Sequence, residues 1–110
     1  MSKDRCVFCK IISQELPVML VAQNEHAVVF ADRSPEAPVH LLVVPRLHRA
    51  SINDLTDQDT PMVAGMLALI QQLAQTHGNT KDKGFKLEVN TGASAGQSVF
   101  HMHWHFKAGR

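Results

Sequence analysis

The chain has 110 residues, of which 45% are hydrophobic, so it can build the core of one domain but is too short for two. We expect a single domain over 1–110. A formal net charge of +1, without a basic tail, argues against a broad nucleic-acid-binding surface, although backbone amides could still bind one phosphate. With no signal-like or membrane-spanning apolar run, and with two cysteines too few for a disulfide scaffold, we expect a soluble cytoplasmic protein that binds no membrane.

The first half of the chain predicts a short helix followed by strands. Residues 6–12 are apolar and indicate a helical turn. Residues 18–22 and 27–31 read as two β-strands joined by a polar turn, which is a hairpin pattern. After a loop with two prolines at 34–38, residues 39–44 form an almost continuous run of branched apolar side chains, typical of a buried central strand. We expect His40, in that run, to form a hydrogen bond with a backbone group.

The second half predicts one long helix and two more strands. Thr60 suits an N-cap, Pro61 the first helical position and Gly78 the end. Residues at spacings of three and four form the expected buried face: Val63, Met66, Leu67, Ile70, Leu73, Ala74 and His77. Residues 85–90 alternate between apolar and polar side chains, and a loop leads from there to a histidine-rich strand. The order of elements predicts an α+β fold with a mostly antiparallel five-stranded sheet, one long helix and a short N-terminal helix.

Three histidines at a spacing of two stand out near the end of the sequence. His101, His103 and His105 alternate with large apolar residues over 100–106. Because successive side chains of a strand point to opposite faces, we expect all three imidazoles on one face of a single strand. Three histidines in register beside a small-residue loop at 96–98 are seldom only structural, and they point to catalysis or to metal binding.

Two chemistries suit this pattern. One is a catalytic metal; His101 and His105 would lie about 13 Å apart along a strand, so one ion could not bind all three histidines and would need Asp32 or His48 as further ligands. The other is nucleophilic catalysis by the middle imidazole, because a neutral histidine nitrogen attacks phosphorus and forms an intermediate that water can cleave. The donors of the loop 96–98 would then stabilise phosphoryl transfer.

The stretch from Gly96 to Phe106 resembles the signature of the histidine triad (HIT) family, His-φ-His-φ-His-φ-φ, where φ is apolar. Segments 6–12, 30–40, 45–48 and 89–90 are similar to other parts of the family pattern, so the resemblance covers nearly the whole chain. It is closest to the histidine triad nucleotide-binding, or Hint-type, branch and implies a HIT-like fold and a homodimer. Lys107 departs from the pattern, because an apolar residue is usual there.

The resemblance also implies roles for individual residues. His103 would be the nucleophile that takes up the nucleotidyl group, and His105 would bond phosphate oxygens. Ser98 would hold the phosphate and donate to the leaving group, and His101 completes the predicted catalytic set. Asp32 would accept hydrogen bonds from the ribose hydroxyls. Phe30 would lie beside a purine, Asn90 would contact the phosphate or the ribose, and Gln97 would hold the phosphate and the leaving group. The other predicted substrate contacts are Gly96, Val99 and His105.

Cys6 and Cys9 form a Cys-x-x-Cys pair in the N-terminal turn. A redox pair fits poorly, because no thioredoxin-like pattern surrounds them. Two cysteines and two histidines make a closed structural zinc site, and the resemblance implies His48 and His101 as the partners. Two thiols without a metal are the alternative. A zinc ion would tie the N-terminal turn to the sheet without being needed for the chemistry.

Together these features predict an enzyme that binds a purine nucleotide. We expect a hydrolase or nucleotidyl transferase that cleaves the P–N bond of adenosine 5′-phosphoramidates, or aminoacyl adenylates, with no cofactor required for the chemistry. The alternatives are a nucleotide sensor or interaction module with weak activity, a dinucleoside polyphosphate hydrolase and a metallohydrolase. Hint-type relatives often continue further past the third histidine, where the tail selects leaving groups, so the leaving group stays open.

Overall fold

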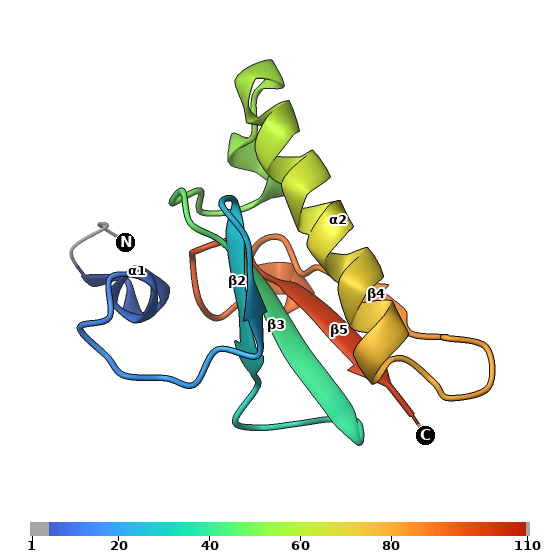
Figure 1. Ribbon diagram of the computed structural model, residues 1–110. Helices are drawn as coiled ribbons and strands as arrows, with labels where there is room; N and C mark the ends of the chain where they lie inside the picture. Colours follow the sequence, from blue (N-terminus) through green and yellow to red (C-terminus); the bar gives the residue numbers. More distant parts are fainter. Residues whose placement is uncertain (1–4, 110) are drawn as a thin grey trace.

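The structure is a computed structural model that describes residues 5–109 (Figure 1). It confirms the predicted α+β class: a five-stranded sheet, with strand order β1-β2-β3-β5-β4, in which all neighbouring strands pair antiparallel. No helix in this part of the chain is long and apolar enough to cross a membrane. The elements are α1 (Val7–Ile12), β1 (Ala22–Gln23), β2 (Ala27–Ala31), β3 (Val39–Pro45), α2 (Thr60–His77), β4 (Lys86–Glu88) and β5 (Trp104–Ala108).

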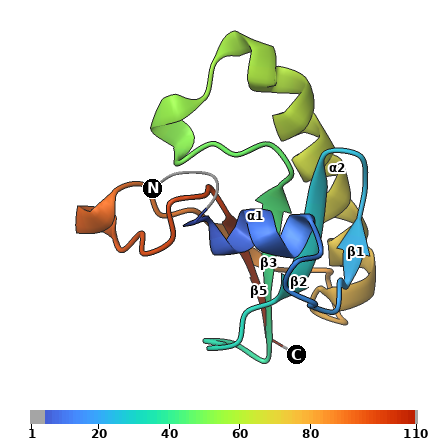
Figure 2. The ribbon, with the colours of Figure 1, turned by 90° about the vertical axis from the view of Figure 1, so that its left-hand side faces the viewer.

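The two helices cover opposite faces of the sheet, as Figures 1 and 2 show from two directions. Alternation along each strand explains this arrangement, because one set of side chains packs under α2 and the other under α1. Under α2, residues such as Val29, Val43 and Phe106 form a core with the buried side of the helix. Under α1, a second cluster contains Cys6, Phe8, Ile11, Val28, Phe30, Leu42 and Val44.

The long helix begins one residue earlier than the sequence predicts. Thr60 is the first helical residue and not the N-cap, which is Asp59, at the end of a 3-10 turn over Asp57–Asp59. The carboxylate of Asp59 does not cap the helix. It accepts a hydrogen bond from the Thr56 backbone N–H and binds the Arg49 guanidinium through both oxygens, at 3.0 Å each. Gly78 ends the helix as expected.

The buried face of α2 is rotated from the predicted one. The structure buries Met62 and Leu69 with Met66, Ile70, Leu73 and Ala74, whereas Leu67 is 46% exposed. Apolar residues lie almost all around this helix, so spacing alone could not decide between neighbouring faces. Gly65 marks where the β1–β2 turn crosses the helix: Asn24 donates to the Gly65 carbonyl at 2.9 Å, and a Cβ at Gly65 would lie 2.3 Å from the His26 ring.

The predicted strand over 18–22 is wrong except at its last residue. Only Ala22 and Gln23 pair with β2, while Val18 lies at the edge of a cavity and Met19 is 88% exposed. The apolar side chains of residues 18–22 therefore do not indicate a strand. Leu16, Pro17 and Val18 line the cavity on the α1 side of the sheet.

The histidine strand also begins later than predicted. β5 starts at Trp104, so His101 and His103 precede it and the three imidazoles do not share one strand face. The backbone departs from the sheet here because the N–H of Met102 donates to the Arg49 carbonyl, at 2.7 Å, in the segment that follows β3. As a result, His101 turns away from the cavity that His103 and His105 line.

Candidate active site

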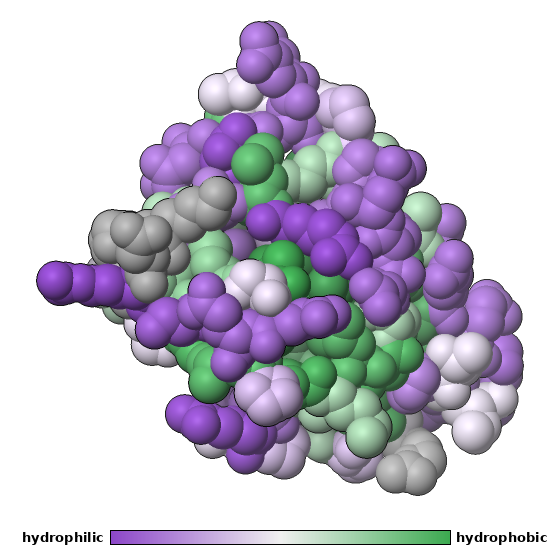
Figure 3. Space-filling model, turned by 60° about the vertical axis from the view of Figure 1, so that its left-hand side comes forward, coloured by the Kyte–Doolittle hydropathy of each residue, from purple (hydrophilic) through white to green (hydrophobic). Residues whose placement is uncertain are grey.

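A cavity of about 720 Å³ lies on the α1 side of the sheet. This volume is within the usual range for a small-molecule site. In a view that brings this side of the molecule forward, apolar surface is gathered beside hydrophilic side chains (Figure 3). Of the residues predicted to contact substrate or take part in the reaction, all but two line the cavity: Phe30, Asp32, Asn90, Gly96, Ser98, Val99, His103 and His105. The exceptions are His101 and Gln97.

His103 presents its Nε2 atom as an acceptor. Its Nδ1 lies 2.8 Å from the His101 carbonyl, which can only accept, so Nδ1 carries the proton and Nε2 has the free lone pair. Burial lowers the pKa of His103, and the hydrogen bond to the carbonyl only partly opposes that effect. The imidazole is therefore a neutral base held in one tautomer beside the cavity, as a nucleophile toward phosphorus must be.

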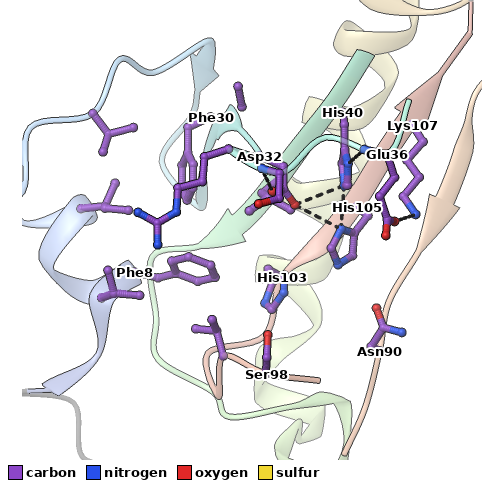
Figure 4. Close-up of a pocket in the computed structure, with 18 of the residues that line it drawn as sticks. Phe8, Phe30, Asp32, Glu36, His40, Asn90, Ser98, His103, His105 and Lys107 are labelled. Carbon is purple, nitrogen blue, oxygen red and sulfur yellow. Dashed lines mark hydrogen bonds and ion pairs between the residues drawn. The ribbon is translucent and has the colours of Figure 1, made fainter. Parts of the chain in front are cut away.

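His105 has the opposite tautomer, fixed by His40. The Glu36 backbone N–H donates to His40 Nδ1 at 2.9 Å, which leaves the His40 proton on Nε2. That Nε2 lies 2.9 Å from His105 Nδ1, so His40 donates and His105 accepts (Figure 4). The remaining proton of His105 is on Nε2. Burial, with the nearby His103, lowers the pKa of His105 and keeps it neutral, so it is a hydrogen-bond donor next to the His103 acceptor.

His40 is a site residue that sequence analysis missed. It forms the backbone hydrogen bond predicted for it, but its ring also lines the cavity and contacts His105. Its Nε2 is 3.4 Å from one oxygen of Asp32, whose other oxygen accepts from the Ser34 backbone N–H at 2.8 Å. Asp32 is thus both the turn residue that its sequence context suggests and a carboxylate at the edge of the cavity.

The loop 91–99 is held by Gln97. Its side chain accepts from the Gly92 N–H at 2.8 Å and donates to the carbonyls of Ala50, at 2.6 Å, and Val99, at 3.0 Å. These bonds use the amide of this buried residue to shape the loop, so no side-chain contact with a phosphate is assigned to Gln97. Gly96 has a φ of 92°, a left-handed conformation that favours glycine.

Two aromatic rings line one end of the cavity. Phe8 from α1 and Phe30 from β2 meet edge to face with ring centroids 5.6 Å apart. Phe8 also contacts the His103 ring, at 5.1 Å. Sequence analysis assigned no ligand contact to Phe8, because the short apolar segment 6–12 indicated only a helical turn. We call these two rings the aromatic slot, which lies beside the His103 ring (Figure 4).

Cys6, Cys9, His48 and His101 converge at one point, as predicted for a metal site. The four ligand atoms all lie within 4.8 Å of one another. Nδ1 of His101 is 3.3 Å from Cys6 Sγ and 3.5 Å from Cys9 Sγ, and Nδ1 of His48 is 3.3 Å from Cys9 Sγ. Tetrahedral zinc with bonds of 2.0–2.3 Å separates nitrogen and sulfur ligands by about 3.5 Å. These distances fit such an ion.

The protonation of His101 also fits metal binding. Its Nε2 lies 2.8 Å from the Pro45 carbonyl, so that nitrogen carries the proton and the lone pair of Nδ1 faces the two cysteines. A carbonyl behind a histidine is the usual support of a metal ligand. Burial lowers the pKa of His101 to about 4, which keeps the imidazole in the neutral form that a metal requires. A zinc ion here would supply a structural link between α1 and the segment 101–103.

Asp32, His40 and His105 form a second group of potential ligands. Their hydrogen bonds do not suit a metal. His40 Nδ1 accepts from a backbone N–H, so Nε2, which faces the other two residues, keeps its proton and has no lone pair to offer. The structure therefore gives no support to a metallohydrolase that uses Asp32 with these histidines.

The sequence and the structure both match known proteins of one class. The family profile described as "Scavenger mRNA decapping enzyme C-term binding" matches residues 5–109. Protein HitA of Neisseria gonorrhoeae is 38% identical over 93% of this chain and 94% of its own length. The purine nucleoside phosphoramidase of Escherichia coli (strain K12) is 33% identical over 97% of this chain and 89% of its own length.

Solved structures show the same fold. A HIT family hydrolase from Legionella pneumophila superposes with a TM-score of 0.89 at 39% identity, covering 96% of this chain and 94% of its own. A histidine triad protein from Clostridium difficile gives a TM-score of 0.90 at 35% identity, covering 100% of this chain and 95% of its own. The chain belongs to the histidine triad family. Its relatives include hydrolases, which supports an enzymatic role in nucleotide hydrolysis.

Proposed function

We propose that this protein hydrolyses adenosine 5′-phosphoramidates, or aminoacyl adenylates, through a nucleotide bound covalently to His103. The observation that carries the proposal is the tautomer of His103, whose protonated Nδ1 binds the His101 carbonyl while Nε2 faces the cavity with a free lone pair. A relative at 33% identity is named a purine nucleoside phosphoramidase, and we extend that activity to this chain.

The substrate would lie along the cavity from its aromatic end to its polar end. We place the purine at Phe8 and Phe30, the ribose hydroxyls at Asp32, and the phosphate between His103 and His105. This orientation puts apolar atoms against aromatic rings and hydroxyl donors against a carboxylate acceptor. Further phosphate contacts would come from Asn90, Gly96, Ser98 and Val99.

The reaction would proceed in two displacements. In the first, His103 Nε2 bonds to the α-phosphorus as the P–N bond breaks, and the amine leaves with a proton that we assign to the Ser98 hydroxyl. His105 donates from Nε2 to a phosphate oxygen and stabilises the charge that develops there. In the second, a water oxygen bonds to phosphorus as its proton passes to the Ser98 oxygen, the bond to His103 breaks, and the nucleoside monophosphate leaves. Zinc at the Cys/His cluster would hold the segment 101–103 and take no part in bond breaking.

The protein would act as a homodimer, by pairing along β4. This strand lies at the edge of the sheet, and Leu87 within it and the flanking Phe85 and Val89 are partly exposed. An apolar edge strand is an aggregation risk unless something covers it, and a second copy of the chain would do so. Sedimentation of the purified protein tests this, with a mass of twice 12.2 kDa expected.

The direct test of the mechanism is to trap the intermediate. The protein is mixed with an adenosine 5′-phosphoramidate, quenched in alkaline denaturant within the first turnover, and digested for mass spectrometry. We expect the mass of a nucleotidyl group on the peptide that contains His103. Substrate consumption without an adduct on His103 would refute the mechanism. An adduct that forms and is never released would favour a nucleotide sensor instead.

A further inference from the structure

Lys107 is held by two carboxylates at the polar end of the cavity. Its ammonium lies 2.6 Å from Oε1 of Glu36, in the loop after β2 (Figure 4). The same ammonium lies 2.6 Å from Oε1 of Glu88, in β4. The Lys107 side chain is only 15% exposed although it ends in a charge. We refer to Glu36, Glu88 and Lys107 as the charged clamp. All three residues line the cavity, and none was predicted to contact substrate.

The register of the sheet places this clamp next to the reacting groups. Glu88 pairs with His105 across β4 and β5, and Lys107 pairs with His40 across β5 and β3. Directly paired residues point to the same face, so Lys107 continues the cavity-facing row of β5, about 7 Å beyond His105 at ~3.3 Å per residue. The aromatic slot lies at the opposite end of the cavity (Figure 4). A substrate whose base occupies that slot therefore directs its leaving group to the polar end.

The clamp has an excess of negative charge. Hydrogen bonds from Lys107 lower the pKa of both Glu36 and Glu88, and the two carboxylates raise the pKa of Lys107, so all three stay ionised near neutral pH. The remaining charged residues of the cavity wall, Asp32 and Arg33, offset each other. Apart from its histidines, the cavity wall therefore carries three carboxylates against two cations.

Because carboxylates outnumber cations, the clamp should bind a cationic group more readily than an anionic group. An anionic group that approaches Lys107 must displace a carboxylate and is then repelled by it. A cationic group can bind Glu36 without breaking the clamp, because a carboxylate accepts up to about four hydrogen bonds and Lys107 uses only one oxygen of Glu36. The second oxygen of Glu88 already lies 3.8 Å from the ammonium of the exposed Lys86.

We propose that Glu36, Glu88 and Lys107 select the leaving group by charge, favouring amines that carry a positive charge over those that carry a carboxylate or phosphate. The inference rests on the proposed function, and it narrows the substrate class of that site. It disfavours dinucleoside polyphosphates, whose leaving group is a phosphate chain, and favours phosphoramidates of cationic amines.

Three adenosine 5′-phosphoramidates test the proposal: one of propylamine, one of a diamine of similar length, which keeps a free ammonium, and one of β-alanine, which keeps a carboxylate. We expect kcat/KM to be highest for the diamine compound and lowest for the β-alanine compound, with a ratio of roughly tenfold between them at low salt. The ratio should fall as salt is added, because the clamp is open to solvent.

Two variants with opposite expected effects make the test specific. Lys107→Met removes the cation and should increase the preference for the diamine compound, whereas the double change Glu36→Gln with Glu88→Gln leaves Lys107 unpaired and should reverse it. Lys81→Met is the matched control, because Lys81 is exposed in the loop after α2, outside the cavity wall, and its loss should leave the ratio nearly unchanged. Simple loss of packing would lower all three rates alike, and a ratio that no clamp variant alters would overturn the proposal.

Binding measurements distinguish a failure of charge selection from a failure of the proposed mechanism. The same three compounds are titrated into the clamp variants in a His103→Asn background, where no turnover is expected, and the ratios of Kd are compared. If the unaltered protein cleaves none of the compounds but the Kd ratios follow the clamp charges, the catalytic mechanism is wrong and charge selection holds. If all are cleaved and the ratios in both readouts ignore the clamp, charge selection is wrong and the mechanism holds.

Discussion

The Cys/His cluster and the cavity lie on either side of the same short segment, 101–103, and they use their imidazoles in different ways. At the cluster, His101 directs the lone pair of Nδ1 at two thiols and is wholly buried, with Phe8 packed against its ring at 6.0 Å. At the cavity, His103 directs the lone pair of Nε2 into a space large enough for a nucleotide. One imidazole has protein partners for every polar atom, and the other keeps one atom for a ligand.

The difference arises from the nitrogen that each backbone carbonyl binds. The Pro45 carbonyl takes Nε2 of His101, and the His101 carbonyl takes Nδ1 of His103, so neighbouring histidines have opposite tautomers. Both are neutral because burial lowers both pKa values. A closed site and an open site are thus built from one residue type by hydrogen bonds to two carbonyl groups. Variants should separate the two functions.

The largest expected effect on catalysis is from His103→Asn. Asparagine can still donate to the His101 carbonyl but supplies no nucleophile, so kcat should fall by at least about 10³-fold while nucleotide binding, metal content and Tm stay close to those of the unaltered protein. Steady-state kinetics, calorimetric titration with a nucleoside monophosphate and metal analysis measure these quantities. His77→Asn, at the end of α2, is the matched control. A variant that retains activity would remove His103 from the mechanism.

The reverse pattern is expected from Cys9→Ser. This change removes one thiolate of the cluster but no cavity-facing group of the mechanism, so the protein should lose bound zinc and its Tm should fall by on the order of 10 °C. Activity at low temperature should fall less than for His103→Asn. Metal analysis and thermal unfolding test this, with Ser13→Ala, at the other end of α1, as the control. Unchanged metal content and Tm would show that the cluster holds no structural ion.

Much of the fold was predictable because hydrophobic residues recur along its strands and helices at the regular spacing of each element. The apolar run at 39–44 corresponds to β3, and the hairpin partner at 27–31 is β2. The break at Met102 was not predictable, since the acceptor of its N–H is Arg49, which only the tertiary structure brings close. The strand expected over 18–22 failed for a related reason. Val18 lines the cavity and Met19 is 88% exposed, and the sequence pattern cannot distinguish such positions from those of a strand.

The candidate-site residues that belong to short sequence motifs of the family could be predicted from the sequence. Eight of the predicted residues line the cavity, and the four cluster residues converge as expected, although their roles stay predictions. His40 was missed because it reaches His105 only through the pairing of β3 with β5, a register that the sequence does not state. Sequence analysis assigned Gln97 to the substrate, but the structure shows its amide bound to backbone groups. One of these is the Ala50 carbonyl, which comes from a distant segment, so the sequence alone could not show the contact.

A smaller effect on catalysis is expected from His40→Phe. Phenylalanine preserves the buried ring but removes the donor that fixes the tautomer of His105, so kcat should fall by roughly ten- to a hundredfold while KM changes little. His40→Gln, which again offers an acceptor and a donor, should recover part of the loss. Stopped-flow kinetics of both variants test this. If the two variants lose kcat equally, the ring packing of His40 matters and its hydrogen bond to His105 does not.

The smallest expected effect concerns the pKa of His105. Burial lowers this pKa below the ordinary value of 6.5, nearby histidines and Lys107 lower it further, and Asp32 raises it. Because the folded value is below the ordinary one, protonation of His105 opposes folding, and its cost should appear only as the pH falls below 6.5. Asp32→Asn removes the one opposing charge, so the titration midpoint of His105 should move to still lower pH, by a fraction of a unit. NMR titration of the His105 ring in both proteins measures this. A midpoint that rises in Asp32→Asn would mean that the His40 donor, rather than the field of the carboxylate, controls the proton on His105, and it would place the two histidines in a single coupled titration.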